Sequence, residues 1–114
     1  GILTMEKKKK KAAPVLNSRQ KKYLKGLGHH LDGLVFIGKE GLSEQVISAT
    51  DLELLRHELI KVKIGNNSEA DKHEVAENLP VATASALVQL IGKTLLLYRP
   101  NPKQEPEKRI SLPK

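Results

Sequence analysis

The spacing of apolar residues alternates between the period of a helix and that of a strand, and this alternation restricts the possible folds more than any other feature. Helical spacing occupies three segments, which begin at Asn17 or Ser18, at Ser43 and at Ser68 and end near Leu27, His57 and Leu79. Strand-like runs occupy residues 34–37, 59–64, 86–91 and 94–99. The resulting order α-β-α-β-α-β-β indicates a compact α/β fold, a two-layer or partly three-layer sandwich.

The apolar positions inside these segments predict the core. In residues 59–64 three β-branched residues alternate with two lysines, which is typical of a strand with one face in the core. Residues 34–37 are all apolar, so we expect a strand that is buried on both faces, with Phe36 in the core. The buried stripe of the first helix is expected to consist of Tyr23, Leu24 and Leu27.

Cap and turn residues predict where the elements end. Ser68, with Asp71 three residues later, resembles a capping box, and Pro80 is expected either to end the third helix or to kink it. Gly92 opens a two-residue loop that suits a type II′ turn between the last two strands. The polar tail that follows contains a short β-like stretch at residues 110–112.

Positive charge is concentrated at the start of the chain. The net charge is +7, and residues 1–25 hold nine basic residues and one acidic residue, whereas residues 26–99 hold seven basic and ten acidic residues. Such clustering favours a polyanionic partner, either nucleic acid or, less favourably, an anionic membrane. We expect a disordered basic arm over residues 1–15, of which 1–4 are a remnant of cloning, and one domain with a short tail over residues 16–114.

Length and composition exclude several classes of protein. A chain of 114 residues without cysteine has room for one domain and offers neither disulfides nor thiolate sites. Because the sequence has no signal-peptide pattern and no apolar run of about 18 residues, we expect a soluble, cytoplasmic monomer that does not bind membranes. The four histidines lack metal-ligand spacing: His29, His30, His57 and His73.

Catalytic residues are also hard to assemble. Ser43, His57 and Asp51 form a triad only on paper, because Ser43 is better explained as a helix cap. We therefore expect no enzymatic activity, no metal or other cofactor, and no small-molecule substrate.

Residues 38–41 form the most informative local motif. Two glycines, Gly38 and Gly41, enclose Lys39 and Glu40 between a strand and the start of a helix. Such a loop lets the backbone approach a phosphodiester closely, beside the positive end of the helix dipole. The alternative interpretation is a tight turn between strand and helix.

The first helix adds a basic surface. Its charged residues spread over more than one face, although Lys25 lies near both Lys21 and Lys22: Arg19, Lys21, Lys22 and Lys25. Because aromatic residues are few, we expect the chain to bind the nucleic-acid backbone more than its bases. The lysines at 7–11 are either part of this surface or a solubility tail.

Five blocks along the chain resemble the stand-alone bacterial CRM domain, the YhbY-like RNA-binding family. These blocks are QKKYLKGL (20–27), VFIGKEGLS (35–43), HELIKVK (57–63), IGKTLLLYRP (91–100) and ISLP (110–113). The resemblance covers roughly residues 16–113.

This resemblance implies a fold similar to the C-terminal domain of translation initiation factor three, with a KH-like GXXG loop. It also implies association with RNA in precursors of the large ribosomal subunit. Residues 38–41 would contact RNA, with the first helix as the flank of that surface. The alternative is a generic basic adaptor that binds DNA or a protein partner through the lysine-rich arm.

Overall fold

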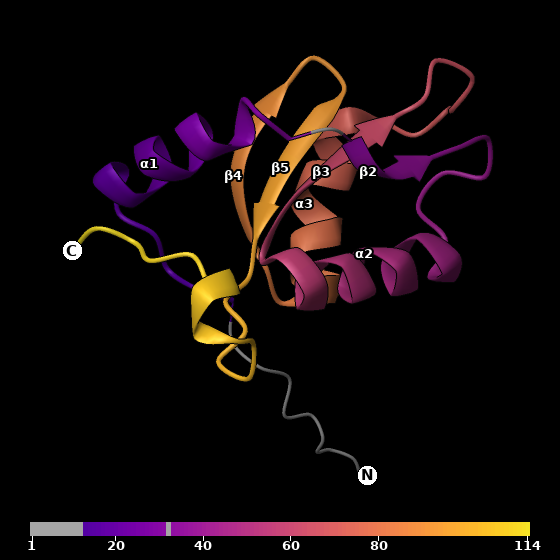
Figure 1. Cartoon of the computed structure of the whole chain (residues 1–114). Coiled ribbons are helices and arrows are strands. Elements are labelled where there is room, and N and C mark those ends of the chain that lie inside the picture. Colours follow the sequence, from indigo (N-terminus) through magenta and orange to yellow (C-terminus); the bar gives the residue numbers. More distant parts are fainter. Residues whose placement is uncertain (1–12, 32) are drawn as a thin grey trace, which may run out of the picture.

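The fold is organised around a four-stranded sheet with the strand order β2-β3-β5-β4 (Figure 1). The computed structural model describes residues 13–31 and 33–114, so most of the expected basic arm lies outside the described residues. The elements are α1 (Ser18–Gly28), β2 (Gly33–Ile37), α2 (Glu44–His57), β3 (Leu59–Ile64), α3 (Lys72–Thr83), β4 (Ala86–Ile91), β5 (Thr94–Tyr98) and the 3-10 helix η1 (Pro106–Lys108). The expected order of helices and strands is confirmed.

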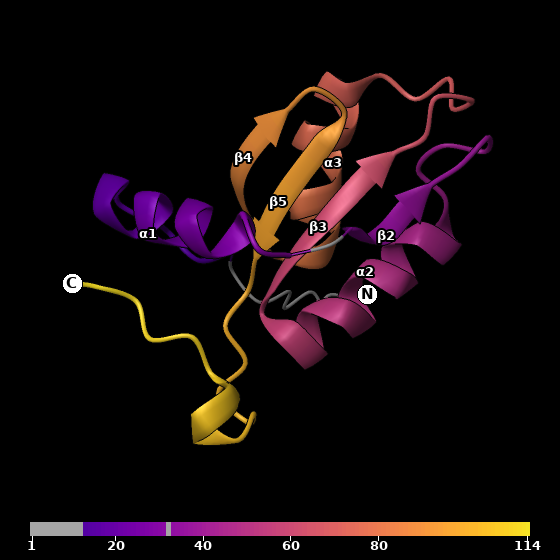
Figure 2. The ribbon, with the colours of Figure 1, turned by 45° about the horizontal axis from the view of Figure 1, so that its top comes forward.

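Helices cover the two faces of the sheet unequally. β2 and β3 are parallel and are connected through α2, whereas β5 is antiparallel to both β3 and β4. Helices α2 and α3 cover one face, and α1 with the C-terminal segment covers part of the other (Figures 1 and 2). The partly three-layer form of the sandwich therefore describes the molecule. In the hairpin between β4 and β5, Gly92 has a φ of +57°, which suits the expected type II′ turn.

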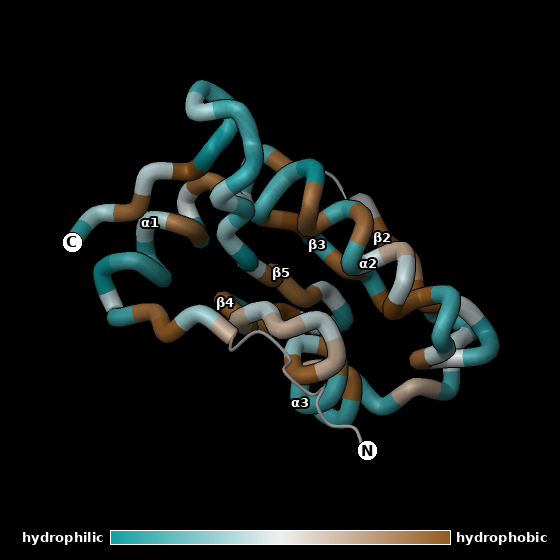
Figure 3. The backbone as a smooth tube through the Cα atoms, turned by 90° about the horizontal axis from the view of Figure 1, so that it is seen from below, coloured by the Kyte–Doolittle hydropathy of each residue, from teal (hydrophilic) through white to brown (hydrophobic). Residues whose placement is uncertain are grey.

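Two hydrophobic clusters lie on opposite faces of the sheet. The larger one joins Ile60, Val62 and Ile64 of β3 to residues of α2 and α3, and all three side chains are buried as the alternation predicts. The smaller one joins Leu24 of α1 to Leu96 of β5. Figure 3 shows that α2 is amphipathic, because hydrophobic residues recur along the helix between hydrophilic ones.

The prediction that Phe36 lies in the core is wrong. Its neighbours Val35 and Ile37 are buried against α2, but the Phe36 side chain is 64% exposed. In the sheet formed by the described residues β2 is an edge strand, and α1 packs against β3 and β4 on the second face. A continuous apolar run therefore occurs here in a strand with one buried face.

Three further expectations differ from the structure in detail. Tyr23 is 42% exposed, because one step of about 100° along the helix turns it away from the sheet on which Leu24 packs. Asp71, not Ser68, caps α3, since its carboxylate accepts from the His73 amide, while the Ser68 hydroxyl accepts from the Ala70 amide. Helix α3 continues through its internal proline to Thr83.

The C-terminal segment also differs from its β-like interpretation. Residues 110–112 are not part of the sheet; Ile110 and Leu112 instead pack against the smaller cluster on the α1 side. An extended backbone is enough to turn both side chains toward this cluster, so the alternation of Ile110 and Leu112 does not require that the segment pair with a strand.

Glu58 anchors this C-terminal segment. Its fully buried carboxylate accepts from the amides of Asn101 at 2.5 Å and Ile110 at 2.6 Å, and from Arg109 Nε at 3.4 Å. Its carbonyl oxygen accepts from the Arg99 amide at 2.8 Å. Burial raises the pKa of the Tyr98 phenol, and the Glu58 carboxylate raises it further, whereas Arg109 lowers it. Glu58 thus connects the junction of α2 and β3 to the end of the chain.

We predict that Glu58→Ala destabilises the protein by about 2–4 kcal/mol, because it leaves two amides without their acceptor. Glu58 has a φ of +64°, which favours glycine, so Glu58→Gly should be less destabilising than Glu58→Ala by about 1 kcal/mol. Urea denaturation measures both values. An alanine variant as stable as the native protein would contradict the anchoring role.

Candidate nucleic-acid interface

The loop of residues 38–41 forms a tight turn between β2 and α2. The Gly41 amide donates to the Gly38 carbonyl at 3.0 Å, and Gly41 has a φ of +71°. Lys39 and Glu40 at the tip are exposed. Within the part of the chain that the structure describes, no heavy atom beyond Gly38 and its two chain neighbours lies within 4 Å of a Cβ placed on Gly38, so the backbone at that position is open to a ligand.

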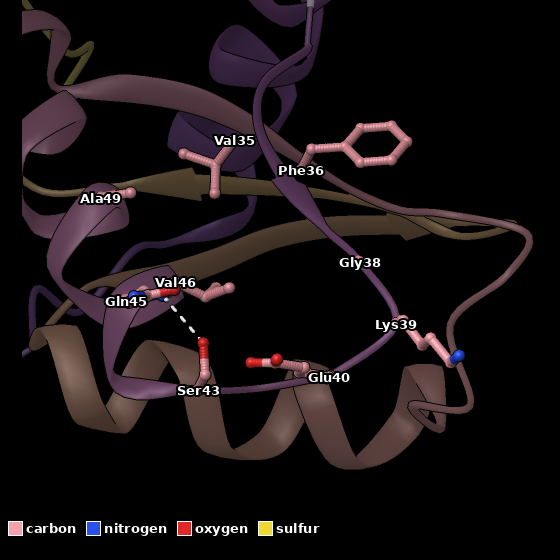
Figure 4. Close-up of a pocket in the computed structure, with 10 residues that line it drawn as sticks. Val35, Phe36, Gly38, Lys39, Glu40, Ser43, Gln45, Val46 and Ala49 are labelled. Carbon is pink, nitrogen blue, oxygen red and sulfur yellow. Dashed lines mark hydrogen bonds between the residues drawn. The ribbon is translucent and has the colours of Figure 1, made fainter.

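The loop and the start of α2 border a shallow pocket (Figure 4). The Ser43 hydroxyl accepts from the Val46 amide at 3.3 Å, which confirms Ser43 as the helix cap. The positive end of the α2 dipole faces this region. In Figure 4 the Glu40 side chain points toward Ser43, and Lys39 points away from the pocket. The acid in the loop therefore lies on the side where the helix dipole would attract a phosphate.

The other side of the loop is acidic. There Lys39 and Glu40 border a second pocket together with Glu69, Asp71 and Glu74. Three carboxylates from the start of α3 and the segment before it repel a polyanion. A phosphate backbone is therefore favoured on the side of the loop that continues into β2.

The basic helix does not lie beside the loop. Its four cationic side chains are exposed, as expected: Arg19, Lys21, Lys22 and Lys25. However, α1 packs against β3 and β4, and it lies at the opposite end of the molecule from the loop between β2 and α2 (Figures 1 and 2). The two groups of expected site residues therefore form separate parts of the surface.

Between these two groups lies the part of the sheet that, among the described residues, neither α1 nor the C-terminal segment covers. Lys61 borders a shallow pocket together with Lys25 and His29 at the end of α1. Lys63 follows on the same face of β3, and it is paired in register with Phe36 of β2. The surface formed by Lys61, Lys63 and Phe36, called here the open sheet face, thus joins the end of α1 to the loop.

Sequence reasoning missed the open sheet face as a site. The alternation in residues 59–64 does place both lysines on the outer side of the strand. The alternation does not reveal that β2 pairs with β3, or that α1 covers only the part of the sheet distant from β2.

The hypothetical triad does not assemble. Ser43 and His57 lie at opposite ends of α2, about 20 Å apart at 1.5 Å per residue. Asp51 pairs with Arg99 at 2.6 Å, and His57 Nε2 lies 3.3 Å from Glu53. Arg99 also donates to the Thr83 carbonyl at 2.7 Å, so this contact joins β5 to both α2 and α3.

Within residues 13–31 and 33–114, no three His, Asp or Glu side chains are grouped as metal ligands. The helices of this part of the chain are also too short or too polar to cross a bilayer.

Comparison with known proteins assigns the chain to a family. Residues 16–99 match the CRS1 / YhbY (CRM) domain, and this match extends over most of the chain. The chain belongs to the CRM domain family. The resemblance seen in the five sequence blocks is therefore confirmed.

Relatives of this CRM domain occur in several bacteria. A protein of Haemophilus influenzae named RNA-binding protein is 40% identical over 99 residues, which cover 87% of this chain and 96% of the relative. The Probable RNA-binding protein YqeI of Bacillus subtilis is 38% identical and is covered completely, again over 87% of this chain. The solution structure of the hypothetical protein SAV1595 from Staphylococcus aureus matches with a TM-score of 0.71 and 43% identity, over 87% of this chain and all of that one.

We predict different responses of this CRM domain to alanine at its two loop glycines. Gly41→Ala should cost about 1 kcal/mol of stability, because its φ of +71° is strained for a residue with a Cβ. Gly38→Ala, which has open space and no such φ, should stay within about 0.5 kcal/mol of the native protein. Denaturant titration of both variants checks this, and equal losses would contradict the assigned turn.

Proposed function

We propose that this CRM domain is a non-enzymatic RNA-binding protein that holds the RNA backbone with the GXXG loop and the open sheet face. The observation that carries the proposal is the turn at residues 38–41, which exposes Lys39 and an accessible Gly38 next to Lys63 and Phe36. Support also comes from relatives across the CRM family, whose names describe RNA binding.

Charge explains how the RNA would be oriented. Lys39 borders a pocket with Phe36, whose register partner is Lys63. Lys61 lies two residues before Lys63 on β3 and borders a pocket with Lys25 of α1, so a row from the loop to α1 follows from these pairs. The acidic side formed by Glu69, Asp71 and Glu74 meets this row at Lys39, whereas Lys61 and Lys25 border a different pocket. A phosphate backbone would thus run from the loop across the open sheet face toward the end of α1.

Single substitutions at the loop tip test this function. We predict that Lys39→Gln weakens RNA binding about fivefold, near the upper range for one exposed ion pair, and makes the salt dependence shallower. Glu40→Gln should strengthen binding, because it removes a carboxylate beside the start of α2. Fluorescence anisotropy with labelled RNA over a salt series measures both effects.

The two variants control each other, because each replaces one charged tip residue by glutamine. If both left RNA affinity and its salt dependence unchanged while remaining folded, the loop would not be the binding site.

The partner that we propose is ribosomal RNA in precursors of the large subunit, as the family resemblance implies. In this form of the proposal the protein is a cytoplasmic monomer without a cofactor, and it assists assembly stoichiometrically by shielding or holding RNA. No reaction is required, so its contribution depends on occupancy alone.

Sedimentation of a cell lysate tests this partner. We expect the native protein to migrate with large-subunit precursors, and Lys39→Gln to shift part of it to the top of the gradient. A protein absent from all ribosomal fractions that instead copurifies with DNA or a protein would favour the adaptor alternative.

A further inference from the structure

Phe36 is an exposed aromatic side chain held by a rigid backbone. Phe36 is 64% exposed, although Val35 is 5% exposed and Ile37 is fully buried. Because these two neighbours are fixed in the core, the strand cannot rotate to bury the ring without exposing them. The Phe36 side chain accordingly points away from Val35 and Val46 in Figure 4. The exposure of Phe36 therefore follows from the burial of its two neighbours.

Gly65 provides the support on which the ring rests. A Cβ at Gly65 would lie 2.9 Å from Cε2 and 3.2 Å from Cζ of Phe36, so the ring occupies the space that a side chain would need. The Gly65 amide also donates to the Ile37 carbonyl at 2.9 Å. The ring therefore packs over the Gly65 backbone on one side, while most of the residue's surface is exposed.

A lysine lies beside the ring. Lys63 is the register partner of Phe36 in the parallel pair of strands, so their side chains lie next to each other on the same face. Lys39 and Gly38 follow within three residues along the chain. A protein partner that covered the ring would also have to bury Lys63. Among the other exposed large apolar side chains, Leu52, Leu55 and Val81 lie on α2 and α3, away from this face. Tyr23 lies on α1, and Ile91 at the end of β4 borders the pocket of Lys61 and Lys25.

We propose that Phe36 stacks on an unpaired base of single-stranded RNA, while Lys63 and the loop bind the adjoining phosphates. This inference rests on the proposed RNA binding and specifies its substrate class. A base within a duplex is covered on both faces by its neighbours and offers the ring no surface, whereas a single strand can turn one base out onto an aromatic side chain. The open sheet face thus selects single-stranded RNA.

Three proteins and two kinds of RNA test the stacking. Native protein, Phe36→Leu and Phe36→Tyr are titrated with a labelled single strand and with the duplex of the same sequence. Leucine keeps an apolar side chain without a stacking ring, so its affinity for the single strand should fall about tenfold while its duplex affinity stays unchanged. Tyrosine should retain native affinity. All three should have similar thermal midpoints, because the side chain is exposed.

A set of single strands with one abasic position identifies the stacked base. One of these positions should weaken binding to the native protein and to Phe36→Tyr, and it should have no further effect on Phe36→Leu. An equal abasic penalty in native protein and Phe36→Leu, or an unchanged affinity of Phe36→Leu, would overturn the proposal.

Lys39→Gln, measured in the same series, distinguishes RNA binding by the loop from base stacking by Phe36. If it weakens binding and Phe36→Leu does not, RNA binding by the loop stands and stacking is wrong. If neither variant weakens binding, both are wrong. Sedimentation velocity provides the remaining outcome: a native dimer that Phe36→Leu dissociates without loss of RNA affinity would make Phe36 a protein contact and would overturn the stacking role.

Discussion

The position of the C-terminal segment, which covers one face of the sheet together with α1, depends on the buried carboxylate of Glu58. It accepts hydrogen bonds from two backbone amides of the C-terminal segment, and its own carbonyl accepts from the end of β5. These bonds place the segment where Ile110 and Leu112 cover the cluster around Leu24 and Leu96. Since buried charge is unfavourable without partners, this one side chain requires the whole segment to be in position.

α1 and the C-terminal segment cover only part of the second face of the sheet, and the part that they leave exposed is the surface that we propose for RNA. They cover β4, β5 and the start of β3 at Leu59, whereas in the part of the chain that the structure describes Lys63 of β3 and Phe36 of β2 remain exposed. Along the path that we propose for the RNA, residues distant in sequence, at 25, 36, 39, 61 and 63, follow one another. In this proposal the loop motif is one end of the path.

Local chemistry accounts for what could be predicted from the sequence. The Ser43 cap, the alternation of Ile60, Val62 and Ile64 with lysines, and the Gly92 turn each depend on interactions between residues close in the chain. Phe36 could not be placed in this way, because an apolar run does not reveal whether a strand is central or at an edge. The separation of α1 from the loop likewise depends on which part of the sheet the helix covers, and that is a tertiary property.

The edge position of β2 has a consequence for solubility. An edge strand presents unpaired backbone groups, and a neighbouring exposed phenylalanine would make such an edge attractive to a second copy of the chain. β2 has only five residues, and charged side chains lie close to it at Lys39 and Lys63. Like charges on two approaching copies repel, so the cations that we assign to phosphate also act as gatekeepers against strand-to-strand aggregation when no RNA is bound.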